Sequence, residues 1–209
     1  MKQLAFFISA VLAGGMIGVG CAVYLGSGRT PVGAVLFAVG LYTICVYGME
    51  LFTGRVGYLV QNPPSYLGAL AGVWLGNLTG TVLCGLLLRH AQPVLGASAA
   101  QLTAAKLAQE PAQTFALALF CGMLMFVAVD SYRQGAGTAR FFGVFLCVPT
   151  FILAGFEHVV ADMAYFAMGM TAEQLAQGAR FLLICTIGNA AGACLIPLWK
   201  KMQTHGISA

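Results

Sequence analysis

Six long stretches almost without charged residues are the feature that most restricts how this chain can fold. A helix needs about 20 apolar residues to cross the hydrocarbon layer of a membrane. Charged residues make up 8% of the 209 residues, against about 25% in an ordinary soluble domain, so too little polar surface is available to cover a water-soluble globule. The sequence therefore predicts an all-α membrane protein with a single transmembrane domain over residues 1–209. The expected spans are at about residues 4–25, 32–60, 66–88, 112–130, 141–170 and 178–199.

Two of these windows are too long for one simple helix and carry polar residues at membrane depth. The window 32–60 contains the polar stretch from Gly48 to Arg55, and the window 141–170 contains Ala154 to His158. Unwound backbone is tolerated inside a membrane only where it is packed in protein or lines a cavity. We therefore expect the second and fifth transmembrane helices to be broken.

The two halves of the chain resemble each other. The stretch from Leu75 to Gly80 is similar to that from Ile187 to Gly192, and Glu50 before one break matches Glu157 before the other. Three spans per half force the second copy to insert upside down, so the pattern predicts an inverted 3+3 repeat over about residues 1–90 and 112–200, with a central site between the halves. Chance similarity between glycine-rich membrane helices is the alternative.

His158 is the most informative single position. Ionisable residues inside a membrane are costly and usually functional, and an imidazole can exchange a proton near neutral pH. A structural histidine, hydrogen-bonded between helices, fits the position equally well. Thr53, in the other break, could donate its hydroxyl to an anion or to His158, or bond back to its own helix.

Four charged residues invite two interpretations each. We expect Glu50 and Glu157 to bond the freed backbone N–H groups of the broken helices rather than to act in chemistry. Lys106 and Arg140 could attract anions to a pore mouth, or they could be a solvated loop lysine and a snorkelling arginine.

Large apolar residues in the two broken windows could narrow a pore, because hydrophobic constrictions can gate by dewetting. Most residues of this kind in a membrane protein simply pack or face lipid. The candidates are Phe37, Leu41, Phe52 and Phe151.

Several classes of function find no support in the sequence. No nucleophile–base pair, metal cluster or phosphate-binding glycine loop is evident, so neither an enzyme nor a cofactor or metal is expected. The net charge of +4 is small and scattered, which argues against a nucleic-acid partner. The seven cysteines have no C-x-x-C spacing and fit small apolar packing residues.

Five separated segments, in order and spacing, resemble the formate/nitrite transporter family over nearly the whole chain. This resemblance implies an aquaporin-like fold of six spans, one pore per subunit and a homopentamer in the lipid bilayer. It also implies transport of small monovalent anions, formate first, with nitrite or hydrosulfide as alternatives. The segments are Ala13 to Gly20, Glu50 to Gly54, Gly76 to Asn77, Gly155 to His158 with Met163, and Thr186 to Asn189.

The resemblance also implies roles for particular residues. His158 matches the central pore histidine, and Thr53 and Asn189 match its hydrogen-bonding neighbours. Lys106 and Arg140 match the positions thought to attract anions. The constriction is matched by Phe37, Leu41, Phe52 and Phe151.

Several positions depart from the family pattern, among them Arg140, where a lysine is usual, and Val159, where a serine is usual. Asp162 replaces an asparagine one turn beyond His158, where its charge could act on the histidine or pair elsewhere. Arg55 and Gly122 each stand where asparagine is common. These departures bear on regulation and substrate choice more than on the fold.

The expected mechanism is passage of an anion past His158, with a proton from the histidine neutralising a weak acid in transit. Without an exchangeable proton, the pore would act as an anion channel. A membrane scaffold with a vestigial pore is the rival from another class. The Lys and Arg bias modestly favours cytoplasmic N- and C-termini, in a prokaryotic cytoplasmic membrane.

Overall fold

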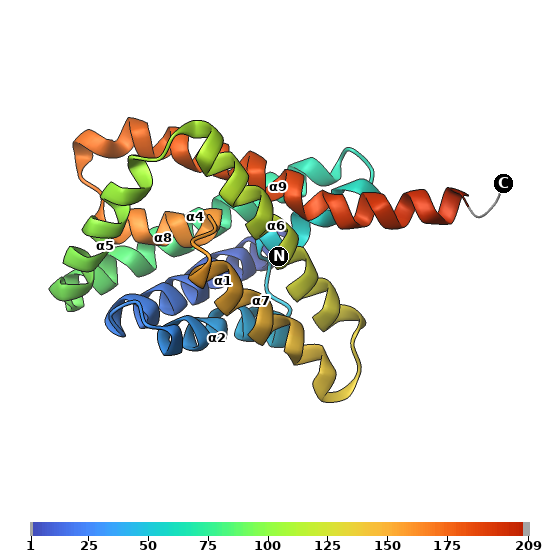
Figure 1. Cartoon of the computed structure of the whole chain (residues 1–209), viewed down its shortest axis with the longest axis horizontal. Helices are drawn as coiled ribbons and strands as arrows, with labels where there is room; N and C mark the ends of the chain where they lie inside the picture. Colours follow the sequence, from blue (N-terminus) through green and yellow to red (C-terminus); the bar gives the residue numbers. More distant parts are fainter. Residues whose placement is uncertain (1, 207–209) are drawn as a thin grey trace.

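The computed structural model describes residues 2–206, and nearly all of them are helical. Figure 1 shows α5 and the C-terminal end of α9 at opposite ends of the molecule. The elements are α1 (Lys2–Gly26), α2 (Pro31–Tyr47), α3 (Phe52–Arg55), η1 (Val56–Gln61), α4 (Tyr66–Ala91), α5 (Pro93–Leu107), α6 (Pro111–Gln134), η2 (Gly137–Phe141), α7 (Phe142–Leu153), α8 (Val159–Gly169), η3 (Ala172–Gln174) and α9 (Leu175–Gly206).

Within the described residues, four helices and one bent helix pair are long and apolar enough to cross a membrane, and two shorter apolar helices occupy the fifth predicted window. The helices α1, α4, α6 and the last span, mostly α9, are each long and apolar enough to cross a membrane. The second span is bent by 55° where α2 gives way to α3 and η1. The fifth consists of two shorter apolar helices, α7 and α8, separated by an unwound stretch. The predicted breaks in the second and fifth spans are thus confirmed.

The connection between the third and fourth predicted spans, about residues 89–111, is mostly the helix α5. Pro93 lies in its first turn, where the missing N–H costs nothing. The helix packs on α8 and buries Leu95, Ala99 and Lys106. The charged residues and prolines of this segment are typical of a loop. The segment is helical because it packs on α8, which lies far away in the sequence.

The helices α2 and α7 occupy matching places in the two repeats and lie antiparallel. Tyr42, late in α2, contacts Phe141 and Phe145 around the start of α7, while Phe37, further back in α2, contacts Phe151 near the end of α7. The breaks that follow α2 and α7 therefore lie toward opposite ends of this helix pair. Antiparallel counterparts are the geometry that an inverted repeat requires.

The backbone leaves the two helices in the same way. Gly48 (φ 63°) and Gly155 (φ 69°) adopt the left-handed conformation that ends many helices. The following N–H groups, of Met49 and Phe156, donate back to Ile44 O and Phe151 O, both at 2.9 Å. Each break is thus a helix end built into the sequence by glycine.

Close backbone contact between the first and third spans of each repeat depends on glycine. A Cβ at Gly14 in α1 would collide with the backbone of Asn77 in α4, and a Cβ at Gly122 in α6 would collide with that of Asn189 in α9. This contact accounts for the glycine at position 122 of this chain. Small residues that let helices approach closely are typical of membrane interfaces.

Gly14→Ala should lower the free energy of unfolding by about 1–3 kcal/mol, the usual cost of overpacking a tight contact. Its neighbour provides the control, since a Cβ at Gly15 meets nothing within 4 Å. Gly15→Ala should be neutral or stabilising by up to about 1 kcal/mol. Thermal unfolding of the detergent-solubilised protein measures both, and equal midpoints for the two variants would contradict the close contact.

Candidate functional site

Two buried asparagine side chains satisfy the backbone of the breaks. Asn77 Oδ1 accepts the N–H of Phe52 at 2.8 Å, and its Nδ2 donates to Ala10 O (2.8 Å) and Glu50 O (2.9 Å). One amide therefore joins α1, α4 and the α2–α3 break. An unsatisfied backbone group in a membrane costs several kcal/mol, so these bonds make the unwound backbone possible.

Asn189 repeats the arrangement in the second half. Its Oδ1 accepts the N–H of Val159 at 2.9 Å, and its Nδ2 donates to Ala118 O and Glu157 O, both at 2.8 Å. The resemblance implies a neighbour that bonds His158, but the amide instead binds the backbone on either side of that residue. The position supports the histidine rather than touching its ring through a hydrogen bond.

The expectation for Glu50 and Glu157 is wrong, because their carboxylates bind cations and an amide instead of freed N–H groups. Glu50 pairs with Arg55, whose Nη2 donates to Glu50 Oε1 at 2.6 Å. Glu157 pairs with Lys106 and accepts from Gln109 Nε2 at 2.7 Å. The N–H groups of Phe52 and Val159 go to the two asparagines on the neighbouring helices.

His158 and Thr53 meet at the centre of the molecule, one from each repeat. Thr53 Oγ1 lies 2.8 Å from His158 Nε2, and both residues are at most 2% exposed. His158 Nδ1 accepts the N–H of Ala161 at 3.0 Å and caps α8. Because Nδ1 is an acceptor here, the arrangement fits a neutral ring whose Nε2–H donates to Thr53.

Aromatic rings extend from His158 along the break. The ring of Phe151 stacks on the imidazole with centroids 5.5 Å apart, and Phe37 meets Phe151 edge-on at 6.0 Å. Leu41 lies about one turn from Phe37 on α2, and Phe52 directly precedes Thr53; both are buried. The four predicted constriction residues thus belong to the buried core around the two breaks.

A cavity of about 160 Å³ reaches His158 from the α7–α8 break. We call it the α7–α8 cavity. It is lined by Tyr24, Arg29, Leu102, Lys106, Phe151, Ile152, Gly155, Phe156, His158, Ala161, Asp162 and Tyr165.

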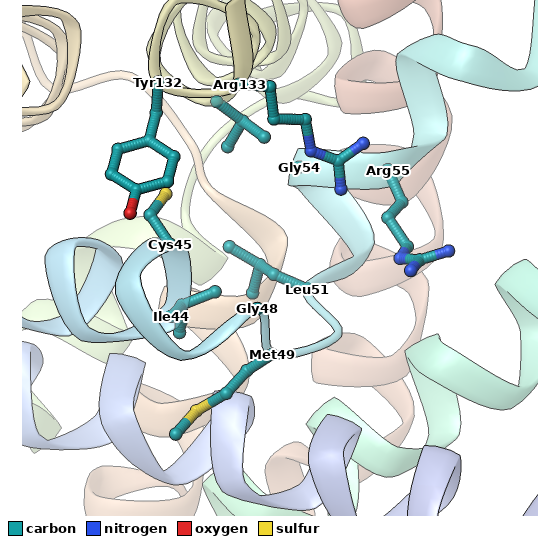
Figure 2. A pocket seen from close by; sticks show the side chains of 10 residues that line it. Ile44, Cys45, Gly48, Met49, Leu51, Gly54, Arg55, Tyr132 and Arg133 are labelled. Carbon is teal, nitrogen blue, oxygen red and sulfur yellow. The ribbon is translucent and has the colours of Figure 1, made fainter. Parts of the chain in front are cut away.

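A second cavity, of about 180 Å³, lies at the α2–α3 break and is called the α2–α3 cavity (Figure 2). Several of its residues occupy positions that match those of the first: Tyr132 and Tyr24, Gly48 and Gly155, Cys45 and Ile152. Because α2 and α7 are antiparallel, the cavities lie on opposite sides of the His158–Thr53 pair. The lining residues are Ile44, Cys45, Gly48, Met49, Leu51, Gly54, Arg55, Val129, Tyr132 and Arg133.

Lys106 is neither solvated nor in a loop. Its side chain is 11% exposed, and Nζ binds Glu157 and Asp162, the latter at 2.9 Å to Oδ1. Asp162 therefore pairs elsewhere rather than with His158, the second of its two predicted alternatives; its Oδ2 also accepts from Cys185 Sγ at 3.4 Å. The sequence did not indicate this cluster, since its members come from α5, the α7–α8 break, α8 and α9.

The two other arginines singled out in the sequence have partners. Arg140 lies over the ring of Tyr132, with Cζ 3.9 Å from the centroid, at the edge of the α2–α3 cavity. Arg55 lines that cavity, but its charge is matched by Glu50.

Comparison with known proteins agrees with this architecture. The profile of the family described as formate/nitrite transporter matches residues 1–200. The nitrite transporter NirC of Salmonella typhimurium LT2 is 29% identical over 90% of this chain and 78% of its own length. The formate channel FocA of Escherichia coli K12 is 29% identical over 83% of this chain and 69% of its own.

Solved structures support the same conclusion. An FNT family ion channel has a TM-score of 0.85 at 27% identity, covering 95% of this chain and 90% of its own. A pentameric formate channel with formate bound has a TM-score of 0.80 at 23% identity, over 97% and 98%. Fold and sequence thus define an integral membrane transport protein rather than an enzyme. The chain belongs to the formate/nitrite transporter family.

Lys106→Met should strongly destabilise the protein, because it leaves Glu157 and Asp162 buried without a cation. Breaking a buried ion pair from one side costs about 3–5 kcal/mol. The loss should shrink as pH falls, since protonation neutralises the unpaired carboxylates. Thermal unfolding in detergent at pH 5 and pH 8 measures it.

The control is the neutral triple variant Lys106→Met, Glu157→Gln and Asp162→Asn, which removes all three charges together. It should recover most of the lost stability. A Lys106→Met protein as stable as wild type at pH 8 would contradict the structural role of the cluster.

Proposed function

We propose that each subunit conducts small monovalent anions through a pore that passes the His158–Thr53 pair. The observation that carries the proposal is this buried pair between two cavities on opposite sides of the molecule. A hydroxyl and an imidazole can offer hydrogen bonds to an anion without a fixed charge that would hold it too tightly. Conduction needs binding that is favourable enough for entry and weak enough for exit.

The aromatic and aliphatic side chains beside the pair would impose selectivity. Phe37, Leu41, Phe52 and Phe151 would form the apolar narrowing, where a bare charge is costly to desolvate. A weak acid could cross such a region as a neutral molecule if a proton joined it near His158. The histidine would supply that proton through Nε2, since Nδ1 is engaged by the Ala161 N–H.

Formate and nitrite are the two leading substrates. Relatives named for each match this chain at the same 29% identity, the nitrite transporter over more of it. Both anions are small, planar and monovalent. We further propose a homopentamer, on the strength of the pentameric neighbour, in a prokaryotic cytoplasmic membrane with both termini in the cytoplasm.

Uptake into proteoliposomes tests the function. Formate, nitrite, hydrosulfide and acetate are presented side by side across an imposed proton gradient. We expect rapid flux of formate, nitrite or both, and slower flux of the bulkier acetate. Absence of flux for all four anions, with the protein correctly inserted, would reject the pore and favour a scaffold role.

His158→Asn should make transport independent of pH between about 5 and 7, within the range where an imidazole ordinarily titrates. Asparagine retains a side-chain donor for Thr53 but has no proton to exchange. Flux is measured at several external pH values with the substrate identified above. A pH profile like that of wild type would remove His158 from proton transfer.

A further inference from the structure

Of the two cations expected to attract anions, Lys106 and Arg140, the first carries no net positive charge in its surroundings. Lys106 lies between the carboxylates of Glu157 and Asp162, and all three side chains are at most 11% exposed. One ammonium with two carboxylates sums to zero or to one negative charge, depending on whether a carboxyl holds a proton. Such a cluster does not draw an anion into the α7–α8 cavity.

Arg29 is a second cation that lines the same cavity. It is exposed, and within residues 2–206 no carboxylate lies within ion-pairing distance of its guanidinium. Its backbone adopts φ 62°, an uncommon conformation for a non-glycine residue, held by donation of its N–H to Tyr24 O at 2.9 Å. Glycine or asparagine would adopt this turn at lower conformational cost. An arginine at this position is therefore more readily explained by a function of its side chain.

Arg133 holds a comparable position in the α2–α3 cavity. Its guanidinium lies 4.8 Å from the ring of Tyr58, without a carboxylate at ion-pairing distance in the described part of the chain. The nearby acid Asp130 is bound by Lys200 at 3.1 Å and by Gln134 at 2.7 Å. Figure 2 shows Arg133 extending from α6 beside the cavity, on the same side of the view as Arg55.

We infer that Arg29 and Arg133 are the residues that collect the anion, one at each mouth of the pore. The inference deepens the proposed function and rests on it. Each guanidinium raises the local concentration of small monovalent anions within about 10 Å, the screening length at 0.1 M salt. Neither arginine has a carboxylate at ion-pairing distance in the described part of the chain, so no ion pair has to be broken before an anion approaches.

The chain offers a thiol probe for each mouth. Cys45 lines the α2–α3 cavity, and Ile152, its counterpart in the other repeat, lines the α7–α8 cavity. Cys45 and an Ile152→Cys variant are treated with two methanethiosulfonates, one bearing a sulfonate and one a trimethylammonium group. Mass spectrometry of the labelled peptide gives both rates. Their ratio reports the local potential, because a change in thiol reactivity affects both rates alike.

We expect the anionic reagent to be favoured at both positions in low salt. Arg133→Gln should lower the ratio several-fold at Cys45 only, and Arg29→Gln should lower it several-fold at Ile152→Cys only. Arg180→Gln is the control, since Arg180 lines a different cavity and should change neither ratio. High salt should reduce every difference.

Flux measurements separate this inference from the proposed function. In proteoliposomes, each arginine variant should raise the apparent KM several-fold for anion presented on its own side, with little change in maximal rate. Ratios and KM values unchanged by both substitutions would overturn the assignment of Arg29 and Arg133. Ratios that fall while wild type passes no anion would support the two charges and reject the pore.

Discussion

The structure depends on two asparagine amides that satisfy unwound backbone inside the membrane. Without Asn77 and Asn189, the N–H groups of Phe52 and Val159 and the carbonyl of Glu50 would lack these partners in a medium that supplies none. The arrangement of residues around His158 and Thr53 depends on these hydrogen bonds. They allow α2 and α7 to end partway across the membrane. Polar side chains of the unwound stretches can then lie in the middle of the protein, where a continuous helix would not place them.

The two repeats share a scaffold but differ in chemistry. The position of His158 is matched by Leu51 in the first repeat, and that of Thr53 by Val160 in the second. The His158–Thr53 pair therefore forms only because each half contributes one polar residue to a place where the other half has an apolar one. The same divergence gives Arg55 with Glu50 on one side, and Asp162 with Lys106 on the other.

The sequence predicted the spans and the breaks because both are local signals. Charge-poor windows mark the spans, and glycines beside ionisable residues mark the ends of α2 and α7. It did not predict the helix α5 or the partners of Glu157, because both depend on residues far apart in sequence that meet only after folding. The roles of Asn77 and Asn189 were hidden for the same reason: the repeated Gly-Asn pair was visible, but not the carbonyls that each amide would reach. The role of Lys106 was inferred from its position in the family, and its burial between two acids could not be read from the chain.

The antiparallel relation of the repeats has a consequence for directionality. In the pore proposed above, an ion arriving from either side would meet an arginine, then a small cavity and then the central pair. Such a pathway has no preferred direction of its own. Net movement of the anion therefore follows the electrochemical gradient. Any difference in conductance between the two directions must come from positions where the halves differ, such as Leu51 against His158, and it cannot reverse the direction that the gradient sets.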